Sequence, residues 1–136
     1  MDVTCIHLDG NADTVEFCPD NPFHHILAAA TYTLQESSQP CRVGTLSLFS
    51  IHDKTRLKFI QQIKTSGIFY MKWRPRKGNM QPHLLQADSD GDLTTYCLES
   101  LGMMFSHRWA REGGDALNIP LDISVLANML ILIFRR

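Results

Sequence analysis

The 136-residue sequence lacks an excess of charge of either sign, because 13 Lys and Arg residues stand against 14 Asp and Glu residues and the formal net charge is −1. Without a strong field of one sign, nucleic acid is not expected as a partner, and neither is an anionic membrane. The N-terminus also lacks the basic and apolar segments of a secretory signal, and Asp2 and Asp9 argue against a mitochondrial transit peptide. We therefore expect a cytoplasmic protein.

Closely spaced metal ligands and cysteines are missing as well. The four cysteines contain no CxxC pair and are too sparse for a disulfide scaffold, so reduced thiols are expected. His7 near Cys5, and the adjacent His24 and His25, lack a second spaced pair of ligands for zinc. We predict no metal site and no cofactor. The cysteines are Cys5, Cys18, Cys41 and Cys97.

Catalytic motifs are likewise absent from the sequence. It contains no Gly-x-Ser-x-Gly nucleophile elbow, no phosphate-binding loop and no cysteine within a catalytic motif. Ser47, Ser50 and Ser66 are therefore interpreted as ordinary strand and turn residues. The catalytic residues, if the protein has any, stay unknown at this point.

Short apolar or alternating runs separated by turn residues fill the sequence up to about residue 101, and no segment keeps a 3.6-residue period for long. This pattern indicates β structure. Strands are predicted around residues 15–17, 25–32, 44–51 and 57–63, with a turn rich in proline, asparagine and aspartate after the first.

The same order then begins again, which indicates an internal repeat. Residues 15–19, 25–29 and 44–49 correspond to residues 71–75, 83–87 and 91–96. Four strands per unit, a proline after the first strand and a glycine turn before the third are typical of a β-propeller blade. We predict an all-β, partial propeller in residues 1–101, with blade one over about 11–64 and blade two over about 68–101.

Four strings within this pattern resemble the N-terminal blades of the WD-repeat diphthine methyl esterase family, also called diphthine methyltransferase or diphthamide biosynthesis WD-repeat proteins. The strings are residues 11–19, 28–34, 42–49 and 71–73, and the resemblance extends over roughly residues 11–101. Two features depart from the family. No Trp-Asp dipeptide closes either third strand, and the repeat ends after two blades.

The resemblance implies a hydrolase of diphthamide biosynthesis, which removes a methyl ester from the modified histidine of translation elongation factor two. That reaction requires an activated water or nucleophile and donors for the oxyanion. The matching strings carry core and turn residues only, and a seven-bladed propeller needs on the order of 300 residues. We expect a truncated form that is inactive alone, with elongation factor two as its partner. The alternative is a non-catalytic WD-repeat module that binds a protein partner through its open edge or face.

An acidic turn at residues 88–92 matches a calcium loop only in part, because Leu93 stands where that loop needs glycine. A tight hairpin turn is predicted instead, in which Asp88 or Asp90 bonds the backbone of neighbouring loops. Aromatic residues at matching places in the two blades are predicted to be core residues. They are Phe17, Phe49, Phe69, Trp73 and Tyr96.

The composition changes at Met103, and residues 102–136 are predicted to be an atypical tail. Residues 119–134 are strongly apolar, and Asn118 and Pro120 suit a helix start. Three interpretations stay open: a helix packed on the open blade face, a membrane tail anchor, and a tail foreign to the fold that arises from alternative splicing or a gene-model error. The apolar run is shorter than the 18 residues of a membrane span, so a membrane partner is not expected.

Overall fold

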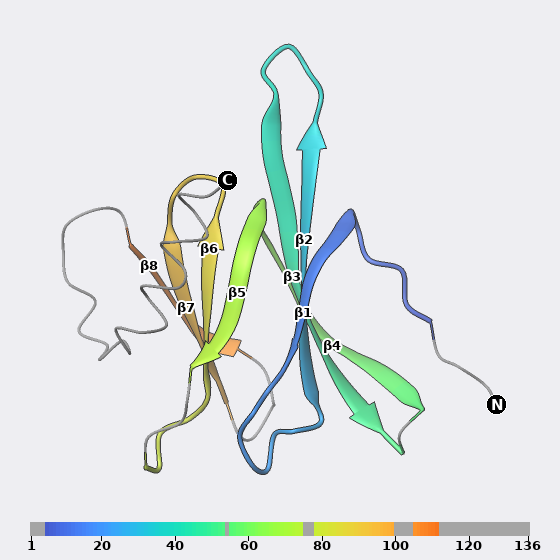
Figure 1. The fold of residues 1–136 in the computed structure, drawn as a ribbon, viewed down its shortest axis with the longest axis vertical. Coiled ribbons are helices and arrows are strands. Elements are labelled where there is room, and N and C mark those ends of the chain that lie inside the picture. Colours follow the sequence, from blue (N-terminus) through green and yellow to red (C-terminus); the bar gives the residue numbers. More distant parts are fainter. Residues whose placement is uncertain (1–4, 54, 75–77, 100–104, 112–136) are drawn as a thin grey trace.

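The computed structural model describes residues 5–53, 55–74, 78–99 and 105–111. They form two antiparallel four-stranded sheets that lie side by side (Figure 1). The first sheet contains β1 (Asn11–Phe17), β2 (Ile26–Gln35), β3 (Cys41–His52) and β4 (Arg56–Ser66). The second contains β5 (Ile68–Arg74), β6 (His83–Asp88), β7 (Leu93–Leu98) and β8 (Phe105–Arg111).

Both sheets have the simple order in which each strand pairs with the next one along the chain. The all-β prediction is confirmed, and two consecutive four-stranded meanders are consistent with two partial blades. The described residues contain no helix that is both long and apolar enough to span a membrane. The helix predicted for residues 119–134 lies outside the described residues.

Strand β8 corrects the predicted end of the second blade. The sequence places that end at residue 101, whereas Phe105–Arg111 pairs with β7 along its whole length. The segment does not alternate apolar and polar residues, so the pattern gives no strand signal there. Backbone pairing with β7 places β8 at the edge of the sheet, and such pairing cannot be predicted from sequence periodicity.

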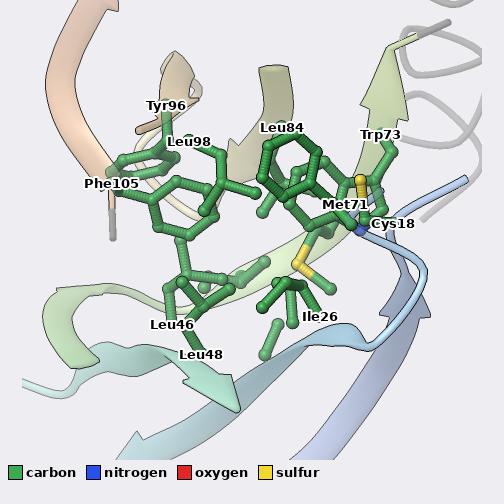
Figure 2. Close-up of a cluster of buried hydrophobic side chains, with 14 residues drawn as sticks. Cys18, Ile26, Leu46, Leu48, Met71, Trp73, Leu84, Tyr96, Leu98 and Phe105 are labelled. Atoms are coloured by element: carbon green, nitrogen blue, oxygen red, sulfur yellow. The ribbon is translucent and has the colours of Figure 1, made fainter. Parts of the chain in front are cut away.

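The hydrophobic core lies between the two sheets. Alternate residues of β2 and β3, among them Ile26, Leu46 and Leu48, face the second sheet (Figure 2). The small side chains of Ala28 and Ala30 belong to the same core and let the larger side chains of the second sheet approach. Phe105 stacks near two other rings, with centroids 6.0 Å from Trp73 and 5.3 Å from Tyr96. The labelled core comprises Cys18, Ile26, Leu46, Leu48, Met71, Trp73, Leu84, Tyr96, Leu98 and Phe105.

Polar contacts also join the sheets. The indole N–H of Trp73 donates to the backbone carbonyl of Glu16 at 3.1 Å. The side-chain amide of Gln61 on β4 accepts the backbone N–H of Phe105 at 2.9 Å and donates to its carbonyl at 3.4 Å. These bonds link the first and last strands of the second sheet to the first sheet.

The prediction for the aromatic residues is correct for three of them and wrong for Phe17. Phe49, Trp73 and Tyr96 are buried, and Phe69 is half-buried beside Tyr32, with 5.3 Å between ring centroids. Phe17 is exposed, because it points to the face of the first sheet that lies away from the second sheet. The repeat predicts the position of Phe17 along its strand. It does not predict whether another sheet covers the face to which the side chain points.

The predicted glycine turn before the third strand exists in one sheet only. Gly91 lies in the β6–β7 turn with a φ of 85°, which favours glycine. Gly44 lies within β3, where the backbones of neighbouring strands approach closely. An added Cβ there would overlap the carbonyl oxygen of Thr31 and lie 2.9 Å from that of Ser66. The prediction is therefore wrong for the first sheet.

Candidate loop-end binding site

Three connections meet at one end of the two sheets, the upper end in Figure 1. They are the β2–β3 loop, the β4–β5 connection at Gly67 and the β6–β7 turn. Backbone hydrogen bonds join them, because Gly67 N–H donates to the Arg42 carbonyl at 3.1 Å and Ser89 N–H donates to the Gly67 carbonyl at 2.8 Å. Both sheets thus contribute to one continuous polar surface.

A cavity of about 610 Å³ opens at this end. Its size falls within the range of small-molecule sites, about 300–1,000 Å³. The polar side chains that line it belong to both sheets, and they are Arg42, Lys64, Thr65, Ser66, Ser89 and Asp90. A second cavity, of about 490 Å³, shares Lys64 and Thr65 with the first and adds Asp9, Thr33 and Thr45.

The two basic residues of the larger cavity belong to two paired strands, β3 and β4. Arg42 pairs with Leu34 at the start of β3, and Lys64 pairs with Thr45 near the end of β4. Thr45 is itself fixed, because its N–H donates to the Thr31 hydroxyl at 2.8 Å. The two basic residues therefore stand on paired strands, and because Arg42 and Thr45 are an odd number of positions apart on β3, the side chains of Arg42 and Lys64 project from opposite faces of the first sheet.

The acidic turn supplies the opposite charge. Asp88 is buried, and its Oδ1 accepts the backbone N–H groups of Asp90 at 3.0 Å and Asp92 at 3.1 Å. Burial raises the pKa of Asp88, and these two bonds oppose that increase. With the turn held in this way, the Asp90 carboxylate accepts a hydrogen bond from the Ser66 hydroxyl across the cavity wall.

The hairpin prediction for residues 88–92 is confirmed by β6, the turn and β7. The predicted role of its carboxylates needs correction. Asp88 bonds the backbone of its own turn, and Asp90 bonds the Ser66 side chain, so neither of these bonds reaches the backbone of a neighbouring loop. In a tight turn, the nearest carboxylate accepts hydrogen bonds from the backbone N–H groups of the turn itself.

Of the three serines singled out in the sequence, Ser66 lines the larger cavity and the other two lie elsewhere. Ser47 accepts the Gln62 amide at 3.4 Å, and Ser50 shares a hydrogen bond of 2.9 Å with His52. The Ser66 hydroxyl is bonded to Asp90. No described histidine lines the cavity with Ser66, so the imidazole base of a serine-hydrolase arrangement is missing from the part that the structure describes.

The described histidines and cysteines do not gather with acidic residues into any group of three or more that could hold a metal ion. His24 bonds the Pro19 carbonyl at 2.8 Å, and the rings of His25 and His52 are 6.2 Å apart. None of the four cysteines forms a disulfide bond.

His83 and Cys97 lie opposite each other on β6 and β7, which brings a potential base beside a thiol. Burial raises the pKa of Cys97, and Glu99 adds to this shift. Burial and nearby Arg74 lower the pKa of His83, although its hydrogen bond to the Gln81 carbonyl opposes them. Both shifts favour the uncharged forms, so the pair is not an activated thiolate–imidazolium nucleophile.

Arg42 and Lys64 are not predicted as site residues from the sequence. They are 22 positions apart (64 minus 42) in the chain, and neither lies in a recognisable motif. Their presence at the same cavity depends on the β3–β4 register and on the close strand approach at Gly44. The acidic turn did carry a signal, because Asp and Gly residues cluster there.

These features define an all-β protein with two packed antiparallel sheets and a polar cavity of mixed charge at the loop end. Among curated proteins, the diphthine methyltransferase of Mus musculus is 34% identical over 74 residues, which cover 46% of this chain and 16% of that protein. The match therefore spans less than a fifth of the relative's length. No protein-family model and no solved structure matches the chain.

Proposed function

We propose that this chain has a function related to that of diphthine methyltransferase, and that it acts in the cytoplasm as a WD-repeat protein. The observation that carries the proposal is the 34% identity to the mouse protein over 74 residues. The proposed partner is translation elongation factor two carrying the methylated, modified histidine. The resemblance implies hydrolysis of a methyl ester, and the proposed role of the chain is to bind the substrate or the product of that reaction.

The loop-end cavity is the proposed binding site. Arg42 and Lys64 suit the carboxylate that ester hydrolysis exposes, since charge-assisted hydrogen bonds to guanidinium and ammonium groups are stronger than neutral ones. Asp90 supplies a negative charge for a protonated imidazole of the modified histidine. The Ser89 hydroxyl adds a donor for the ester or carboxylate oxygens, whereas the Ser66 hydroxyl is donated to Asp90.

Binding without turnover is the proposed activity of this chain. Ester hydrolysis needs a base that activates water or a nucleophile. Within the described part of the cavity, the Ser66 hydroxyl already donates to Asp90, and no imidazole stands beside it. The cavity thus has groups that hold a charged ligand but lacks a complete catalytic arrangement.

The test measures binding and turnover separately. Elongation factor two carrying the methyl ester, and the same protein after ester removal, are each titrated with the full chain by biolayer interferometry. Mass spectrometry of the modified peptide follows ester loss. The variant Arg42→Ala/Lys64→Ala tests the cavity, and Lys58→Ala is the matched control, because Lys58 is an exposed β4 residue outside the cavity.

We expect the wild-type chain and Lys58→Ala to bind the demethylated form, and the double variant to bind it at least tenfold more weakly. No ester loss is expected. Equal binding by all three chains would remove the cavity from the proposal. Turnover at the rate of a full-length homologue would refute the proposed inactivity, and an absence of binding to either form would refute the related function itself.

A further inference from the structure

The second sheet has a face that lies away from the first sheet, here called the far face. One row on this face crosses three strands, because Arg74 pairs with His83 and His83 pairs with Cys97. The adjacent row on the same face contains Leu85 and Thr95. None of these residues belongs to the hydrophobic core between the sheets, which contains the side chains that alternate with them along the strands.

The far face is buried, although the described residues do not account for its cover. Leu85 and Thr95 are 2% and 1% exposed. The described strands form two sheets only, and the first sheet packs on the opposite face of the second. On the face of the first sheet that lies away from the second, by contrast, Val15, Phe17 and Phe59 are each more than half exposed. The comparison indicates that residues outside the described ranges cover the far face.

Arg74 shows which chemical group the cover must bring. The residue is 3% exposed, and none of its three guanidinium nitrogens has a hydrogen-bond partner among the described residues. A guanidinium group keeps its charge in proteins, and a buried charge without a partner is strongly destabilising. The ion pair found in the described part joins Lys72 to Glu16, so it does not involve Arg74. A carboxylate is the side-chain group that matches a guanidinium in both charge and geometry.

Few carboxylates of this chain are left to fill that role. Outside the described ranges, the acidic residues are Asp2, Glu112, Asp115 and Asp122. Asp2 belongs to the N-terminal segment, which leads into β1 of the first sheet. The other three follow β8, the edge strand of the second sheet, so the segment after β8 is the one that can bring a carboxylate to the far face.

The reach of the backbone selects among these three acids. Arg74 lies in the same row of the sheet as His107 on β8, because each strand is paired in register with the next. Three strand spacings of about 4.8 Å, and four residues of about 3.3 Å from His107 to Arg111, put the end of β8 roughly 20 Å from Arg74. Asp115 is four residues past that end, an extended reach of about 14 Å, whereas Asp122 is 11 residues past it (122 minus 111), a reach of about 36 Å. Backbone reach therefore favours Asp122.

We propose that residues 112–134 dock on the far face, and that the Asp122 carboxylate pairs there with the Arg74 guanidinium. Asp122 is the only charged residue between positions 116 and 134, and its neighbours Leu121 and Ile123 are apolar. An apolar segment with one acid thus meets a buried face with one unpaired cation. Docking of this kind closes the far face to protein partners.

The test measures how fast iodoacetamide alkylates Cys97 in the full chain, with mass spectrometry as the readout. Cys97 is a half-buried residue in the same far-face row as Arg74. Cys18 is 1% exposed in the core between the sheets, so its alkylation reports unfolding of the whole chain. The variant Asp122→Asn removes the charge and keeps the size of the side chain. Asp115→Asn is the matched control, because it makes the same change closer to β8.

We expect Asp122→Asn to raise the alkylation rate of Cys97 at least tenfold, and the wild type and Asp115→Asn to share one slow rate. The double variant Arg74→Gln/Asp122→Asn should react no faster than Asp122→Asn, because both lose the same ion pair. An unchanged Cys97 rate in Asp122→Asn, an equal increase in Asp115→Asn, or a further increase in the double variant overturns the proposal.

Hydrogen exchange of the wild-type chain replaces this test if Asp122→Asn also makes Cys18 reactive. Docking predicts that the amides of residues 119–126 exchange at least tenfold more slowly than those of an unstructured peptide with the same sequence. Exchange of these amides at the unstructured rate overturns the proposal.

Discussion

Substitution of Gly44 by alanine tests whether close approach of strand backbones organises the loop-end cavity. Gly44 lies in β3 between β2 and β4. The new methyl group would overlap the Thr31 carbonyl oxygen, lie 2.9 Å from the Ser66 carbonyl oxygen and lie 3.2 Å from the Cα of Gly67. All three are backbone atoms of neighbouring segments, so no side-chain rotation can relieve the contacts.

The expected cost is large for a single methyl group. Overpacking in a well-ordered interior costs about 1–3 kcal/mol. Separating the strands also weakens backbone hydrogen bonds, each of which contributes about 0.5–1.5 kcal/mol. We therefore expect the free energy of unfolding of Gly44→Ala to fall by about 3 kcal/mol, a sizeable fraction of the roughly 5–15 kcal/mol typical of a domain. Urea unfolding followed by circular dichroism measures this difference.

Gly78→Ala is the matched control, because it separates steric overlap from backbone strain. Gly78 has a φ of 60°, and a Cβ at that position would meet no atom within 4 Å. Its substitution should cost only about 1–2 kcal/mol, the penalty of a left-handed conformation for a residue with a Cβ. If Gly44→Ala proves no more destabilising than Gly78→Ala, the close approach of β2, β3 and β4 does not constrain the cavity.

Three further predictions concern the turn, the contact between sheets and acid stability. Asp88→Ala should lower the free energy of unfolding by about 1–3 kcal/mol because two turn amides lose their acceptor, whereas Asp88→Asn keeps an oxygen acceptor and should cost less; urea unfolding compares them. Gln61→Leu should speed hydrogen exchange at the Phe105 amide, measured by mass spectrometry, and unchanged exchange there would contradict the proposed link between β4 and β8. Burial lowers the pKa of His83 below its unfolded value, so the unfolded chain binds its proton first and stability should fall as the pH drops below about 6.5. The urea concentration at the midpoint of unfolding should change less with pH for His83→Gln than for the wild type over the same pH range.

Local chemistry predicts the strands and the acidic turn well, because both depend on neighbouring residues. Alternation of apolar side chains locates β3 and β4, and Asp and Gly residues locate the β6–β7 turn. The missed edge strand β8 has no such alternation and is defined by its pairing with β7. Sequence periodicity therefore predicts the strands that alternate apolar and polar residues. It does not predict β8, which is defined by its pairing with another strand.

The candidate site was beyond prediction for a related reason. Arg42 and Lys64 line one cavity because β3 and β4 pair in a particular register, and Asp90 joins them because the second sheet packs beside the first. The exposure of Phe17 is another long-range property, since it depends on whether a further sheet covers its face. Repeats in the sequence predict which residues are equivalent, but only the number and order of packed units decides which equivalent residues are buried.

Strand β4 contributes to three parts of the structure, and the irregularity in its pairing between Phe59 and Gln61 puts these two residues on opposite faces of the first sheet. Phe59 lies on the face of the first sheet that is away from the second sheet, Gln61 turns toward the second sheet and bonds Phe105, and Lys64 and Ser66 reach the loop-end cavities. Each group can be substituted without touching the others. Gln61→Leu should thus leave ligand binding at Lys64 intact, provided that the β3–β4 pairing survives. If Gln61→Leu also weakens ligand binding, the contact between Gln61 and Phe105 holds β4 in register, and the cavity depends on that contact.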